Sequence, residues 1–366
     1  MASRLIERLD QAIAKAEDPV QRECLKAERA GALARHGLLA EARFALTGVR
    51  TQSQRHRSAL LGAWVSLIDG QIDHFEAVAP KALAKFERAH ELADAAADNS
   101  MKALASAWMA NACFNASNVP AMLGHLRQTL ELAPAELHSA RARVGLVLAD
   151  AYRFAGDDER SQAWYLKARE HASAEGDTSM ISALLHNISA MRSARISLDD
   201  AFGQADRDMA AKALLEAEST ANYDWGAGAA ALAAMVPVIR AQLLAVLGRH
   251  EEAVALFDAY LARARSEGMG HREARFLADR AWCHRNNQRS TEALRDARLA
   301  ERCLAAQFDA DDLAATHARL AQVYAACDRA EEAAAHRARA EQSLAAHRLA
   351  QMEMRNALNA TLDRLG

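Results

Sequence analysis

Apolar residues recur at three- and four-residue intervals along most of this chain, the spacing of helices that bury one face. Alanine is the commonest residue, and Leu, Arg, Glu and Gln, which also favour helices, supply much of the rest. Runs rich in Val, Ile and Thr, from which strands are usually built, are almost absent. The pattern predicts an all-α protein.

One pattern recurs along the chain: a turn residue, a few polar residues, and then a small residue early in an amphipathic helix. It reads GLLAEARFAL from Gly37, AGDDERSQAWY from Ala155 and LGRHEEAVALF from Leu247. The small residues define anchors, which are separated by 40, 40, 39, 40, 52, 40 and 40 residues. A fixed period of this length is typical of repeat proteins. The anchors are Ala42, Ala82, Met122, Ser161, Ala201, Ala253, Ala293 and Ala333.

Each period is interpreted as a helix, a short turn, a second helix and a short loop, giving about eight helix pairs. No single pair can bury all its apolar positions, so neighbouring pairs must stack into a superhelical solenoid. The one longer interval, between Ala201 and Ala253, predicts an insertion that lengthens a helix pair and disturbs the superhelix locally. Pro237 falls inside a predicted helix and is expected to bend it.

The predicted organisation has three parts. Residues 1–18 form an N-terminal capping helix, and residues 19–345 form the repeat domain with an irregular, enlarged unit around 201–253. The helical pattern continues past the last repeat, so residues 346–366 are expected to form an extended C-terminal capping or linker helix.

Composition excludes several classes of protein. Of the 366 residues, 51% are hydrophobic and 25% charged, which is too apolar for wholesale disorder. The five cysteines are widely spaced, which argues against a disulfide scaffold and favours a reducing, cytoplasmic location. The net charge is −3 and arginine is spread through every helix, so we expect no direct nucleic-acid binding. No apolar run is long enough to span a membrane.

No catalytic motif is found. GxxxxGK[ST], GxSxG and HExxH are all absent. The adjacent Cys283 and His284 are interpreted as a packed thiol beside a surface or interface histidine rather than as metal ligands. We therefore expect no catalytic residues, no cofactor and no metal.

The repeat strings resemble tetratricopeptide (TPR) repeats. The resemblance is carried by AYRFAGDDERSQAWYLKAREHASAEGD (151–177) and LGRHEEAVALF, and LLHNISAMRSA (184–194) is similar to the longer repeats of bacterial regulators of the MalT type. The resemblance implies a right-handed α-α superhelix whose concave groove, lined by the first helix of each unit, binds a peptide or protein segment. At three turns the family's usual glycine is replaced by Ser117, Gln288 or Asp328.

Placing the repeat register on the chain puts polar residues in that groove, where Asn and Arg can bond to a peptide backbone or carboxylate. Two groups are the best binding candidates, Asn111/Asn115/Arg143/Arg153 and Arg275/Asp279/Arg285/Asn286. Replacing Arg143 and Arg153 together by alanine is predicted to weaken partner binding without changing helicity. The full set of candidate binding residues is Asn111, Asn115, Arg143, Asp150, Arg153, Asn187, Arg275, Asp279, Arg285 and Asn286.

Two hypotheses for function remain open. The first is a non-enzymatic, cytoplasmic bacterial scaffold whose partner is a protein or peptide. The second is the regulatory or sensor region of a bacterial signalling protein, attached to a diguanylate cyclase or a transcriptional output domain. The long C-terminal helix motivates the second hypothesis, and it also leaves open a homodimer formed through that helix. An enzyme has little support from the residues.

Overall fold

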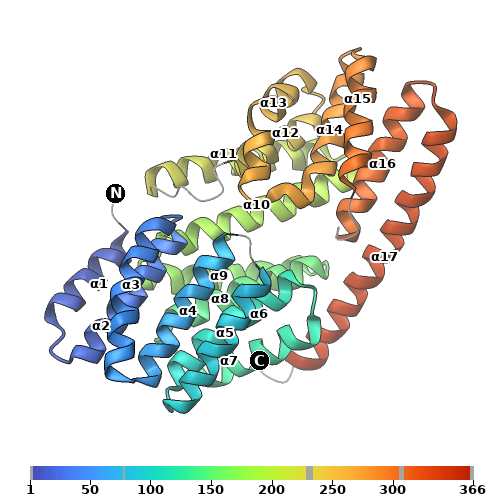
Figure 1. The fold of residues 1–366 in the computed structure, drawn as a ribbon. Coiled ribbons are helices and arrows are strands. Elements are labelled where there is room, and N and C mark those ends of the chain that lie inside the picture. Colours follow the sequence, from blue (N-terminus) through green and yellow to red (C-terminus); the bar gives the residue numbers. More distant parts are fainter. Residues whose placement is uncertain (1–2, 77–78, 228–233, 305–308, 363–366) are drawn as a thin grey trace. The chain divides into compact units, whose positions relative to one another are not determined.

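The chain folds into helices joined by short turns (Figure 1). The computed structural model describes residues 3–76, 79–227, 234–304 and 309–362, and no strand occurs within those ranges. None of the helices described there is both long and apolar enough to cross a membrane. The helices are α1 (Arg4–Lys15), α2 (Pro19–Arg35), α3 (Leu39–His56), α4 (Ala59–Phe75), α5 (Ala79–Ala95), α6 (Asn99–Asn115), α7 (Val119–Leu132), α8 (His138–Phe154), α9 (Asp158–Glu175), α10 (Thr178–Ala201), α11 (Arg207–Ala227), α12 (Met235–Val246), α13 (His250–Ser266), the 3₁₀ helix η1 (Met269–Arg272), α14 (Glu273–Asn286), α15 (Ser290–Cys303), α16 (Ala310–Ala326) and α17 (Ala330–Leu362).

The second helix of each pair begins three residues before its anchor. Ala42, Ser161 and Ala253, for example, lie three residues after the starts of α3, α9 and α13, and all three are fully buried. A small side chain at this position lets the two helices of a pair approach closely. The approach is close where Gly145 of α8 meets α9, because a methyl group on Gly145 would lie 2.9 Å from the Cβ of Ala168.

The predicted anchor Ala201 is wrong. Ala201 is the last residue of α10, and the matching position of the next helix is Ala210, which is fully buried three residues into α11. The lengthened pair is therefore α10 and α11, with 24 and 21 residues. Local sequence misled the assignment because Ala201, like the anchor Ala253, is a buried alanine that follows two acidic residues, although it ends a helix.

The predicted bend at Pro237 is also wrong. Helix α12 begins at Met235, so Pro237 lies in its first turn. The amide groups of a first turn have no acceptor inside their own helix, and proline therefore costs little there.

Within the described ranges, seven turns between the helices of a pair share one backbone geometry. Gly37, Gly156, Gly203 and Gly248 adopt positive φ angles of 81°, 77°, 77° and 77°. The residue after each glycine donates its amide to a carbonyl five residues back, as Asp157 does to Tyr152, which closes the helix end. The other three turns keep this geometry without glycine. Their φ angles are 54° at Ser117, 62° at Gln288 and 59° at Asp328.

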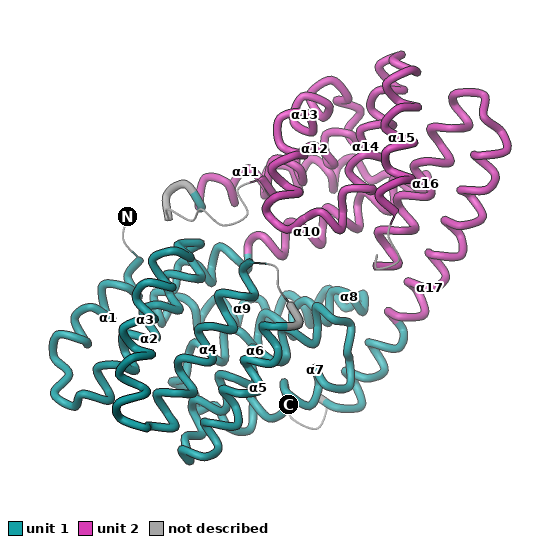
Figure 2. Tube along the Cα trace, in the orientation of Figure 1, with its two compact units in different colours: residues 1–184, 224–231, 352–366 teal, residues 185–223, 232–351 magenta. Residues whose placement is uncertain are grey.

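The chain divides into two compact units, shown in different colours in Figure 2. Unit 1 comprises residues 1–184, 224–231 and 352–366, and unit 2 comprises residues 185–223 and 232–351. Phe86, Leu67 and Leu126 are fully buried in the core of unit 1, which also takes in Leu358 from the end of α17. Phe257 is fully buried in the core of unit 2.

The predicted fold class is confirmed: the described chain is all-α, its helices pair with their neighbours, and it ends in a 33-residue helix, α17. The predicted boundary between 345 and 346 falls inside this continuous helix, and residues 363–366 lie outside the described part. Helices α10 and α17 each contribute residues to both units.

Candidate functional site

A narrow pocket lies within unit 1, among the first helices of successive pairs. Helices α2, α4, α6 and α8 form its walls, and the end of α9 with the start of α10 closes it. The cavity volume is about 30 Å³, on a scale where one water molecule needs roughly 10–15 Å³. We call it the unit 1 pocket. Its lining residues are Glu28, Arg35, Trp64, Ile68, Gln71, Leu104, Trp108, His138, Ser139, Ala142, Arg143, Ala172, Glu175, Asp177 and Met180.

Arg143 is the most unusual of the lining residues. Its side chain is almost fully buried, with 7% exposed, and its guanidinium carbon lies over the Trp108 ring, 3.9 Å from the centroid. Its Nη1 donates a long hydrogen bond, 3.4 Å, to Oδ1 of Asn111. Within the described ranges no carboxylate lies within ion-pairing distance of Arg143. Burial and the nearby Arg35 lower the pKa of Arg143 to about 10, so it remains charged at neutral pH.

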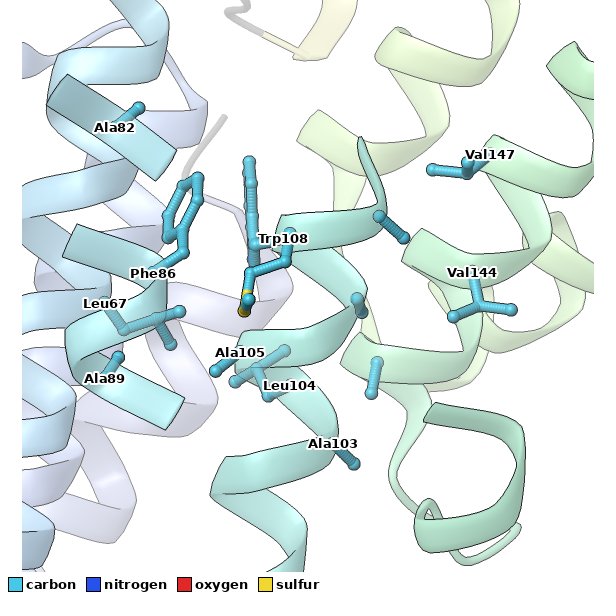
Figure 3. Close-up of a cluster of buried hydrophobic side chains, with 14 of the residues drawn as sticks. Leu67, Ala82, Phe86, Ala89, Ala103, Leu104, Ala105, Trp108, Val144 and Val147 are labelled. Carbon is cyan, nitrogen blue, oxygen red and sulfur yellow. The ribbon is translucent and has the colours of Figure 1, made fainter. Parts of the chain in front are cut away.

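The Trp108 ring is held in place by aromatic neighbours. Phe86 lies at a centroid distance of 5.5 Å and Phe75 at 6.1 Å, and Figure 3 shows Phe86 and Trp108 facing each other in the core. His74 meets the same ring edge-on at 5.6 Å. Burial, together with the charge of Arg143, lowers the pKa of His74 to about 4, so His74 is neutral at physiological pH. This packing fixes the flat surface on which Arg143 stacks.

The turn between α9 and α10 closes the pocket on the α2 side. Arg35 of α2 donates a hydrogen bond from Nε to Oδ2 of Asp177 at 3.0 Å, and its Nη2 lies 2.9 Å from the same oxygen as an ion pair. The other carboxylate oxygen of Asp177 caps α10, accepting from the amide of Met180 at 3.0 Å and from the Ser179 hydroxyl. Arg35 and these hydrogen bonds hold the pKa of Asp177 below its usual value in spite of burial, so this salt bridge stays ionised.

A second carboxylate of the pocket, Glu28 on α2, has no such partner. No hydrogen bond or ion pair joins Glu28 to another side chain of the described chain, whereas the neighbouring Glu175 pairs with Arg8. Burial, and the like charges of Glu175 and Asp177, raise the pKa of Glu28 to about 7. The carbonyl oxygen of Gln71, a side chain with 2% exposed, is also buried in the wall and has no hydrogen-bond partner among the described residues.

The candidate residues in unit 1 only partly come together. Asn111 and Arg143 meet, as described above. Asn115 is exposed, and Asp150 is buried and accepts from the Tyr165 hydroxyl. Arg153 donates to Asp158 at 3.2 Å.

The candidate residues in unit 2 are used by the protein itself. Asp279 accepts from Arg319 Nε at 3.2 Å and from Gln242 Nε2 at 2.9 Å, and Arg319 also pairs with Asp200 of α10. Arg275, with 1% exposed, pairs with Asp312. We call these residues, Asp200, Gln242, Arg275, Asp279, Asp312 and Arg319, the unit 2 polar network.

The last turns of α10 complete this network. Arg275 Nη2 donates to the carbonyl of Ala194 at 2.8 Å, and Gln322 Nε2 donates to the carbonyl of Ala201 at 2.8 Å. Leu198 of α10 packs on Ala314 and Ala315 of α16. The extra length of α10 therefore occupies the side chains that α14 and α16 would otherwise offer to a ligand.

The remaining predicted residues of unit 2 make local contacts. Arg285 donates to the carbonyl of Ala326 at 2.8 Å, and the exposed Asn286 donates to its own helix at Trp282, also at 2.8 Å. Asn187 on α10 is half-buried. The bonds of Arg285 and Asn286 involve neither Arg275 nor Asp279.

Sequence reasoning missed three polar residues of the pocket: Glu28 on α2, Gln71 on α4 and Asp177 in the turn between α9 and α10. Asp177 lies 142 residues from its partner Arg35, and nothing in the local sequence signals that contact. The available signal was the turn at Gly176, where glycine is favoured by the positive φ of 76° and by close packing, since a methyl group there would lie 3.1 Å from the Cβ of Arg4.

Comparison with known proteins agrees with this fold. No protein-family model and no curated protein matches the sequence. Among solved structures, the chain is similar to a crystal structure of a Rap protein complexed with competence and sporulation factor. The TM-score is 0.55 and the identity 14%, over 94% of this chain and 92% of that chain. At this identity the likeness shows the fold alone, and it confirms the TPR-like repeat architecture predicted from the sequence.

Proposed function

We propose that this chain is a non-enzymatic, cytoplasmic interaction scaffold that binds a peptide or protein segment in the unit 1 pocket. The observation that carries the proposal is Arg143: a buried cation stacked on Trp108, in a pocket, with no carboxylate of the described residues paired to it. Burying a charge without a counter-ion costs several kcal/mol, and a ligand that supplies the counter-ion recovers part of that cost.

The similar Rap protein was crystallised in complex with a factor, which supports a binding role for this fold. Unit 2 supports the choice of site by contrast. Its polar network is already bonded to α10, so the comparable side chains there have little left to offer a ligand.

Site-specific photocrosslinking tests the proposal. A photoreactive amino acid replaces Ser139, which lines the pocket, and in a second variant it replaces the exposed Glu91 of α5. We expect the Ser139 variant to crosslink one protein or peptide segment in the source cell, and the Glu91 variant not to crosslink that segment. Loss of the adduct in the Arg143→Ala, Arg153→Ala background supports the site, and an equal yield from both positions contradicts it.

A regulatory role in a signalling protein is the second candidate, and α17 is the feature that favours it. This helix extends well beyond the last repeat and exposes Leu349 and Met352, one turn apart, with 51% and 53% of their surfaces accessible. An apolar pair of this kind suits a homodimer. Light scattering on the wild type and on the Leu349→Glu, Met352→Glu variant tests it: a dimer that the variant dissociates supports the role, and a monomeric wild type contradicts it.

A further inference from the structure

Some charged side chains that line the unit 1 pocket form no ion pair with another described residue. Arg35 is paired with Asp177, and Glu175 is paired with Arg8. After these pairs are counted, one cation and one anion of the lining remain without an oppositely charged partner in the described chain: Arg143 on α8 and Glu28 on α2.

These two groups do not neutralise each other. No ion pair within 4.0 Å joins them, and the charges that act most strongly on Glu28 are those of Glu175, Arg35, Arg8 and Asp177. They project from different walls of the pocket, and Trp64, Ile68 and Leu104 supply apolar surface to the same lining. A ligand that satisfies both must carry a positive and a negative group separated by an apolar body.

Resting on the function proposed above, we propose that the pocket recognises both ends of a short unblocked peptide, its carboxylate at Arg143 and its ammonium at Glu28. The guanidinium offers a carboxylate up to two parallel hydrogen bonds, because among the described residues it bonds only to Asn111. Trp108 holds the guanidinium plane in position before the ligand arrives. Gln71, whose carbonyl oxygen is unpartnered in the wall, adds an acceptor for a peptide N–H.

The pocket is too small for such a ligand as it stands, since its volume is that of about two water molecules. Binding therefore requires lining side chains to move, as interface side chains commonly do.

The test measures binding of four pools of short synthetic peptides to the full chain: unblocked, N-acetylated, C-amidated, and blocked at both ends. Affinity is followed by the fluorescence of the pocket tryptophans and by calorimetry. Each single block removes a charge-assisted interaction, so we expect each to weaken binding about tenfold or more. Equal binding of all four pools overturns the inference, and so does a loss caused by only one of the two blocks.

Variants assign the two ends. In Arg143→Met the C-amidated pool is expected to bind as well as the unblocked pool, because the carboxylate has lost its partner. In Glu28→Gln the same is expected of the N-acetylated pool. Arg127→Met and Glu91→Gln, at exposed ion pairs on α7 and α5, serve as controls and should retain the wild-type preference. A penalty for amidation that persists in Arg143→Met overturns the assignment of the carboxylate.

The outcome separates this inference from the proposed function. If the doubly blocked pool binds as tightly as the unblocked pool, and Arg143→Met weakens both equally, the pocket binds a segment by its interior and only the inference fails. If no pool binds and the Ser139 photocrosslinker captures no segment, the proposed function fails as well.

Discussion

Arg319 of α16 donates a hydrogen bond from Nε to Oδ1 of Asp279 on α14, at 3.2 Å, and both side chains are almost completely buried. Asp200 of α10 shares the same guanidinium. The arrangement holds three helices of unit 2 together by charge, in a place where a repeat protein could have presented a groove. The contribution of these ion pairs to the free energy of unfolding can be measured directly.

We predict that Asp279→Ala destabilises the protein by about 3–5 kcal/mol, because it leaves the buried Arg319 with one counter-ion fewer and breaks the bond to Gln242. Chemical denaturation with fluorescence detection gives the change in the free energy of unfolding. The control is Glu252→Ala, which breaks an exposed pair with Arg249 and should change the free energy of unfolding far less. A small effect of both substitutions would show that the network contributes nothing to stability.

We predict that glycine stabilises the three turns that lack it. Ser117, Gln288 and Asp328 hold left-handed φ angles of 54–62°, which cost a residue with a side chain about 1–2 kcal/mol. Each change to glycine should raise the free energy of unfolding by a few tenths to about 1 kcal/mol, after the greater entropy of glycine in the unfolded chain is subtracted. Gly156→Ala, at φ 77°, should lower it. Thermal melts of the four variants decide the matter, and destabilisation by all three glycines would refute the argument.

We predict opposite effects for alanine at two helical glycines. A methyl group at Gly70 would lie 2.6 Å from the Phe86 ring and 3.2 Å from the carbonyl oxygen of Ala82, so Gly70→Ala should cost about 1–3 kcal/mol. At Gly48, inside α3, nothing lies within 4 Å, and Gly48→Ala should gain about 0.5–1 kcal/mol of helix stability. Differential scanning calorimetry compares them, and equal shifts would show that the close approach at Gly70 is not tight.

We predict that Glu28 makes the protein less stable as the pH rises. Its pKa is raised from 4.5 to about 7 on folding, so between these values the folded chain binds more protons than the unfolded chain. Stability is then lost as the pH rises through this window, by up to about 3 kcal/mol. Glu28→Gln should remove the loss, being more stable than the wild type above pH 7 and similar below pH 4.5. Identical pH profiles would contradict the assignment.

His74 is predicted to act in the opposite direction. Its pKa is lowered from 6.5 to about 4 on folding, so the unfolded chain binds more protons between these values. Stability is lost as the pH falls through this window. His74→Phe keeps a ring beside Trp108 and should flatten the acid side of the profile, which urea titrations at a series of pH values measure. A steeper acid limb in the variant would contradict the prediction.

Much of the fold was predictable because the repeat is local. A helix start three residues before a small, buried residue recurs at Ala42, Ser161 and Ala253, and every signal needed lies within one period. The prediction failed at Ala201 because this buried alanine ends the long helix α10, whereas the other anchors lie near the start of a helix.

The candidate site was less predictable because the register shows only which face a side chain is on. It placed Arg143 and Arg275 alike on the groove side. It could not show that Arg275 pairs with Asp312 whereas Arg143 pairs with no acidic residue in the part of the chain that the structure describes. Glu28 became visible only through the contact of α2 with a turn far along the sequence.

The last turns of α10 have a practical consequence for mutational scans. Because they occupy the donors of α14 and α16, substitutions at Arg275 or Arg319 should reduce the cellular abundance of the protein and, through it, every activity in parallel. Substitutions at Arg143 should instead lower partner binding while leaving the cellular abundance of the protein unchanged. A scan that scores both quantities would sort the arginines of this chain into two classes.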